Sequence, residues 1–140
     1  MKPTFKTIMT AAALAGATAA IVNGILFLLL KAAGIFPDTV HVQTGQPLTV
    51  LPVVLSSIVP SLIAGVVFYL LCRYTQNGYR IFSIVAIILL VLSFANPFMG
   101  IEGIPLTMGI ALNAMHVVVV AALMYFFKRS FSPARQLNFQ

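Results

Sequence analysis

Every charged side chain of this 140-residue sequence lies outside four long apolar blocks. Only 7% of the residues are charged, 61% are hydrophobic, and the blocks cover residues 8–30, 51–72, 81–99 and 104–127. Each block has about the ~20 residues that a helix needs to cross a hydrocarbon layer of ~30 Å. Soluble domains carry charge on about a quarter of their residues, so the composition excludes a soluble fold. The sequence predicts an all-α integral membrane protein, an antiparallel four-helix bundle forming one domain over residues 1–140.

The positions of the basic residues predict how the bundle is oriented. One side of the expected membrane holds seven of the eight, namely Lys2, Lys6, Arg73, Arg80, Lys128, Arg129 and Arg135. The other side holds Lys31, in an outer loop over residues 31–50. Because basic residues near span ends stay in the cytoplasm, both termini are expected there. The basic residues would also attract membrane lipids, whereas nucleic-acid binding is not indicated, since no basic face is interleaved with aromatic residues.

The first block has some features of a cleavable signal peptide, because Lys2 and Lys6 precede apolar residues and a stretch of small ones. Hydrophobicity continues to Leu30, which favours an uncleaved first helix. Cys72 is the only cysteine, so an intramolecular disulfide or a dithiol redox motif is excluded. We interpret Cys72 as a small apolar residue at the membrane interface.

Small residues recur four apart on the first two blocks. They are Ala12, Gly16, Ala20 and Gly24 on the first and Ser57, Ser61 and Gly65 on the second. Residues four apart share a helix face, and small side chains let two backbones approach closely in a membrane. These stripes predict that the first two helices form the closest pair, although either stripe also suits a homodimer.

Proline and glycine mark bends and turns. Pro60 inside the second block predicts a bend and leaves the Ser56 carbonyl without its helical donor. Asn77-Gly78 predicts a tight turn between antiparallel neighbours, and Asn96-Pro97 predicts the end of the third helix. The alternating residues 40–43, followed by Thr44-Gly45, suggest a short hairpin over the outer face.

Uncharged polar residues gather at one depth in the apolar blocks. Counted from the outer ends at 1.5 Å per residue, the depths are roughly 10 Å for Asn23, 9 Å for Ser57, 15 Å for Ser61, 13 Å for Asn113 and 18 Å for His116. Ser93 and Asn96 fall in the same outer half. If these groups face inward, they form a polar pocket that opens outward.

His116 is the central candidate, because ionisable residues inside a membrane are often functional and histidine changes charge near neutral pH. Asn113 lies three residues earlier, so the two should share a helix face. Asn23, Ser57 and Ser61 are the expected partners of His116 in ligand binding. The alternative is that all five only form hydrogen bonds between helices, which contribute about 0.6 kcal/mol each on average in membranes.

The sequence contains few of the motifs that mark known enzymes, transporters or cofactor-binding proteins. No phosphate loop, nucleophile elbow, His-Glu-x-x-His motif or membrane carboxylate pair occurs, so an enzyme is not expected. A small four-helix drug exporter would need a carboxylate in its first span, which is missing, and quinone-linked disulfide enzymes need cysteine pairs. No metal or other cofactor is predicted, since His116 is the single metal-ligating residue within the polar layer. Haem held by His116 and Met115 or Met108 stays open as an alternative.

The run from Ala111 to Val118 contains Asn113 and a Met-His pair followed by small apolar residues. It resembles the last helix of a bacterial family of uncharacterised four-helix membrane proteins, a domain of unknown function. The resemblance covers most of the chain, including the small-residue first helix with Asn23 and the longer outer loop. The resemblance implies a four-span bundle in a bacterial inner membrane and brings no established activity.

The sequence therefore leads to three functional hypotheses. The first is a small inner-membrane protein whose polar pocket binds a small molecule or lipid, or supports transport. The second is a structural or partner-binding membrane subunit, in which the polar residues only hold helices together. The third, a membrane enzyme that uses His116 as a base, has the least support.

Overall fold

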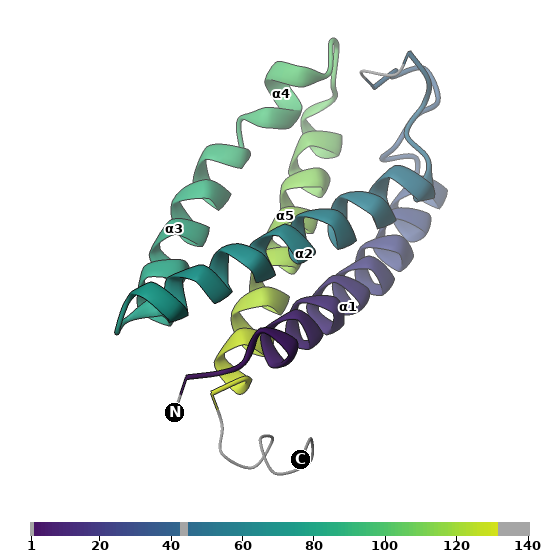
Figure 1. The fold of residues 1–140 in the computed structure, drawn as a ribbon. Helices are drawn as coiled ribbons and strands as arrows, with labels where there is room; N and C mark the ends of the chain where they lie inside the picture. Colours follow the sequence, from purple (N-terminus) through teal and green to yellow (C-terminus); the bar gives the residue numbers. More distant parts are fainter. Residues whose placement is uncertain (1, 43–44, 132–140) are drawn as a thin grey trace.

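The computed structural model describes residues 2–42 and 45–131, and within these ranges the chain is helical (Figure 1). The helices are α1 (Phe5–Ala32), α2 (Val50–Tyr74), α3 (Gly78–Ser93), α4 (Asn96–Gly100) and α5 (Leu106–Arg129). Three of them, α1, α2 and α5, are long and apolar enough to cross a membrane. The chain is therefore an all-helical protein with the features of a membrane protein.

The first, second and fourth apolar blocks each form one long helix, as predicted. Helix α1 begins where the Thr4 hydroxyl accepts a hydrogen bond from the Thr7 N–H at 3.2 Å. Helix α5 begins directly after Pro105, whose fixed φ and missing N–H suit the start of a helix. Helix α2 continues through Pro60, which lies within its span.

The third block differs from the prediction of one helix over residues 81–99. The structure divides it between α3, which ends at Ser93, and the short α4, so there are five described helices rather than four. Pro97 has no N–H to donate to the Ser93 carbonyl, so the α-helical pattern is interrupted there. Hydrogen bonds between residues three apart replace this pattern. The Phe94 N–H donates to the Val91 carbonyl (3.3 Å), and the Ala95 N–H donates to the Leu92 carbonyl (3.4 Å).

Helices α1 and α2 pack with almost no space between their backbones. A Cβ added to Gly65 would lie 2.6 Å from the Cβ of Ala12, and one added to Gly16 would lie 3.1 Å from the Cβ of Ser61. Real Cβ contacts are not this short, so only glycine fits at Gly65 without movement of a neighbour. The predicted pairing of the two small-residue stripes is confirmed.

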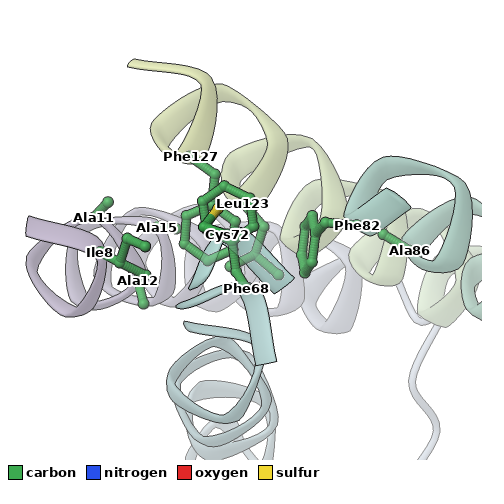
Figure 2. Packing of buried hydrophobic residues seen from close by; sticks show 10 residues of the cluster. All are labelled: Ile8, Ala11, Ala12, Ala15, Phe68, Cys72, Phe82, Ala86, Leu123 and Phe127. Atoms are coloured by element: carbon green, nitrogen blue, oxygen red, sulfur yellow. The ribbon is translucent and has the colours of Figure 1, made fainter. Parts of the chain in front are cut away.

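A cluster of phenylalanines joins α2, α3 and α5 near the α2–α3 link (Figure 2). The rings of Phe68 and Phe127 stack with centroids 4.3 Å apart, and Phe82 packs edge-on against both at 5.1 and 5.0 Å. Figure 2 shows the alanines of α1 on one side of this cluster and Phe82 with Ala86 on the other. The rings thereby fix α3 and α5 to the closely packed α1–α2 pair.

The loop between α1 and α2 folds back onto the helices at the other end of the bundle. Its Phe36 and Val40 are buried in a second apolar cluster, where the Phe36 ring lies 5.0 Å from that of Phe27. His41 and Pro47 form an antiparallel bridge, and the Val42 N–H donates to the Gln46 carbonyl at 2.9 Å. The predicted hairpin is thus present as a single bridge, while Gln43, Thr44 and Arg135 lie outside the described residues.

The close α1–α2 contact predicts that Gly65→Ala destabilises the protein and that Gly24→Ala does not. Gly65→Ala should lower the free energy of unfolding by about 1–3 kcal/mol, because the added methyl group overpacks against Ala12. Gly24→Ala is the matched control, since its Cβ would meet nothing closer than Val50 and Val54 at 3.9 Å. Thermal unfolding in mild detergent measures both, and equal stability of the two variants would contradict the close packing.

Candidate functional site

A pocket of about 380 Å³ lies under the outer loop, between α1, α2, α4 and α5. Its polar lining residues are Asn23, Ser56, Ser57, Asn96 and His116. Its apolar walls include Pro52, Val53, Pro97 and Met115, and Val42 and Leu48 of the loop lie over it. The pocket brings together three of the five predicted residues, Asn23, Ser57 and His116.

Asn23 is the most deeply buried polar group of the pocket, with 2% of its surface exposed. Its side-chain amide donates to the Ser57 hydroxyl and to the Met115 carbonyl, both at 3.1 Å, and so connects α1 with α2 and α5. Because a carbonyl can only accept, the atom facing Met115 must be the amide nitrogen. The other amide atom, Oδ1, is buried without a partner among the described residues. An unsatisfied buried acceptor costs about 1–3 kcal/mol, so this oxygen favours a donor from water or a ligand.

The serine hydroxyls of the pocket already donate their protons to a backbone carbonyl. The hydroxyls of Ser56 and Ser57 both donate to the Val53 carbonyl at 3.0 Å. A hydroxyl has one proton, so each oxygen has only lone pairs left to offer. The Ser56 carbonyl is a further acceptor, since Pro60 cannot donate to it.

His116 is half-buried and holds one fixed hydrogen bond. Its Nδ1 lies 2.8 Å from the Leu112 carbonyl one turn earlier, and a carbonyl only accepts, so Nδ1 carries the proton. The second ring nitrogen, Nε2, has no hydrogen bond within the described part of the chain. In the neutral ring with Nδ1 protonated, Nε2 is an acceptor.

Ser61 and Asn113 lie elsewhere in the structure. Ser61 is completely buried in the α1–α2 contact, where its hydroxyl donates to the Ser57 carbonyl at 2.7 Å. Asn113 donates its amide to the Phe94 carbonyl at 3.1 Å, beside the break between α3 and α4. Residues three apart on a helix differ by about 60° in direction, and this difference sends Asn113 to α3 while His116 lines the pocket.

Two lining residues were not among the predicted site residues. Ser56 was singled out in the sequence only for its free carbonyl, and Asn96 as the end of a helix and as one of the polar groups at the depth of the expected pocket. The signal for both is a nearby proline, because Pro60 leaves the Ser56 carbonyl without its helical donor and Pro97 directly follows Asn96. No assembly of three or more metal-ligating side chains occurs among residues 2–42 and 45–131.

The unpaired polar groups of the pocket are therefore mainly hydrogen-bond acceptors. Asn23 Oδ1, the Ser56 carbonyl and His116 Nε2 are acceptors, while the amide and hydroxyl protons of Asn23, Ser56 and Ser57 are already used. Among the described residues that line the pocket, no side chain is charged, and the free donors belong to the exposed Asn96 amide. This arrangement suits a neutral or cationic group with several N–H or O–H donors and opposes an anion.

A family model described as a family of unknown function (DUF6069) matches residues 3–133, so the chain belongs to this family. The resemblance to a domain family of unknown function is confirmed. No curated protein and no solved structure matches the chain.

The orientation of the Asn23 amide can be tested by two substitutions of similar size. Asn23→Leu loses two hydrogen bonds but removes the unpaired oxygen, so the loss of stability should be small, about 1 kcal/mol. Asn23→Asp sets an oxygen against the Met115 carbonyl in a buried position, and should cost at least about 2 kcal/mol. Thermal unfolding in detergent measures both; an Asp variant as stable as the wild type would show that the amide is oriented otherwise.

Proposed function

We propose that this chain crosses a bacterial inner membrane four times as an antiparallel bundle, with both termini in the cytoplasm. Three helices are long and apolar enough to span a membrane. The fourth crossing is assigned to α3 continued by α4, because the 16 residues of α3 alone reach only roughly 24 Å. Basic residues at the ends of α2 and α5 and at the start of α3 support this orientation.

Single cysteines in a Cys72→Ala background test this topology. Thr39→Cys and Glu102→Cys, both exposed, should react with a membrane-impermeant maleimide in intact cells. Asn77→Cys, exposed in the α2–α3 link, should react only after the membrane is opened. Absence of labelling at Glu102→Cys in intact cells, with labelling at Thr39→Cys, would show that α3 and α4 do not cross.

The proposed activity is binding of a small molecule or lipid in the outward-facing pocket, through hydroxyl or amine groups of the ligand. The unpaired Oδ1 of Asn23 carries this proposal, because this buried acceptor belongs to a side chain that lines the pocket, whereas the equally unpaired Oδ1 of Asn113 does not. The free Nε2 of His116 gives a second acceptor on a different helix, and the apolar walls suit the carbon skeleton of the ligand. Transport of such a ligand would use the same groups.

The ligand class follows from the groups that the pocket lacks. A phosphate or carboxylate would face acceptors without a lining cation, so an anionic ligand is disfavoured. A neutral alcohol or an amine can satisfy both Asn23 and His116 with its own protons. The proposed ligand is therefore a hydroxyl- or amine-bearing molecule with an apolar part.

His116→Leu and Asn113→Leu form a matched pair for testing ligand binding. They remove polar groups one turn apart on α5, yet His116 lines the pocket and Asn113 bonds to Phe94. Native mass spectrometry after mild detergent extraction should find a hydroxyl- or amine-bearing small molecule on the wild type and on Asn113→Leu. The His116→Leu variant should lose it, while its unfolding temperature stays within a few degrees of the wild type.

Two results would contradict this function. The first is the same set of bound molecules on both variants, because His116 would then make no contact with the ligand. The second is copurification of a stoichiometric protein partner with no small molecule, which supports the structural-subunit hypothesis.

A further inference from the structure

A second pocket, also of about 380 Å³, lies at the end of the bundle opposite the outer loop. It is formed by the N-terminal segment, the link between α2 and α3, and the end of α5, which meet near the N label in Figure 1. Its basic lining residues are Lys2, Arg80 and Lys128, one from each of three separate segments. We refer to this pocket as the basic hollow.

No acidic side chain is present to balance these three cations. The whole sequence has two acidic residues, Asp38 and Glu102, and both lie at the other end of the helices. Asp38 is already paired with Lys31 at 2.9 Å. Three like charges around one space repel one another, so the basic hollow favours an anion from outside the chain.

Lys2 is held in position by the link that it faces. Its ammonium group donates to the carbonyls of Arg73 (3.1 Å) and Thr75 (3.3 Å), which leaves one of its three N–H donors free. The exposed side chains of Arg80 and Lys128 make no hydrogen bond or ion pair to a described residue. The hollow thus combines one positioned donor with two adaptable cationic side chains.

One part of the remaining wall of the basic hollow is apolar or aromatic, and another is formed by the uncharged polar residues Thr75, Gln76 and Asn77. Cys72, Tyr79 and Phe131 line the first part, and the rings of Tyr79 and Phe131 meet edge to face with centroids 6.4 Å apart. The Tyr79 hydroxyl bonds to the Met124 carbonyl at 3.3 Å, so the ring is tied to α5. A cationic side beside an apolar side matches a phosphate group joined to a glycerol and acyl chains better than a free ion.

We propose that the basic hollow binds the phosphate group of an anionic phospholipid. This site is separate from the outward pocket, which lies at the other end of the helices and has no lining cation. The same cationic groups could take inorganic phosphate, and the experiment below distinguishes the two sources. A bound lipid would link the N-terminal segment, the α2–α3 link and the end of α5.

Two double variants separate a specific site from general attraction to anionic membranes. Arg80→Gln with Lys128→Gln removes two cations of the hollow, whereas Lys6→Gln with Arg129→Gln removes two exposed cations that do not line it. Both pairs remove two positive charges from the same end of the protein. Native mass spectrometry in detergent, with added phosphatidylglycerol or phosphatidylcholine, measures lipid binding to each.

The wild type and the Lys6/Arg129 variant should bind phosphatidylglycerol equally and in preference to phosphatidylcholine. The Arg80/Lys128 variant should bind it at least about tenfold more weakly, because two charge-assisted phosphate contacts are lost. Arg80→Lys with Lys128→Arg keeps both charges and should restore binding, which shows that the fold is intact. Equal weakening in both glutamine variants, or no change in either, would overturn the proposal.

Inorganic phosphate supplies the second arm of the test. When inorganic phosphate is added at about ten times the molar concentration of the lipid, phosphatidylglycerol should stay bound to the wild type. Displacement of the lipid by phosphate would assign the hollow to a free phosphate ion and overturn the lipid source. Neither result bears on the outward pocket, whose ligand is measured with different variants.

Discussion

The close contact between α1 and α2 determines where the other helices can lie. Lipid tails are as apolar as leucine, so helices in a membrane associate through packing and hydrogen bonds rather than through the hydrophobic effect. Gly65 against Ala12 and Gly16 against Ser61 bring the two backbones together. The same interface places Asn23 beside Ser57, and the Asn23 amide then reaches the Met115 carbonyl of α5. The pocket is thus built on a helix pair held together by small residues.

The break between α3 and α4 gives the pocket its remaining wall. Pro97 interrupts the helix, and Asn113 of α5 donates to the Phe94 carbonyl at that point. The short helix that follows packs closely on α5, because a Cβ on Gly109 would lie 2.2 Å from the ring of Phe98. Asn96 and Pro97 are thereby held at the edge of the pocket.

The pocket under the α1–α2 loop and the basic hollow have opposite chemical character. Among their described lining residues, the first offers acceptors and no cation, whereas the basic hollow offers cations and no acid. The distribution of charge along the sequence explains the difference, since basic residues gather at one end and the acidic residues at the other. The two ends of the bundle therefore differ in the groups that they present, with acceptors at one end and cations at the other.

The sequence by itself determined the helical class, the apolar helices, the pairing of α1 with α2 and the set of polar residues. These features depend on local composition and on the period of 3.6 residues per turn, which are visible in one chain. The tertiary structure decided which polar residues meet, because a rotation of about 60° around α5 separates His116 from Asn113. It also decided which donors are already used. The carbonyls of Met115, Val53 and Leu112 accept hydrogen bonds from the Asn23 amide, the Ser57 hydroxyl and His116 Nδ1, respectively. The sequence does not show which side chain will face a given backbone carbonyl, so the unpaired oxygen of Asn23 is apparent only from the folded chain.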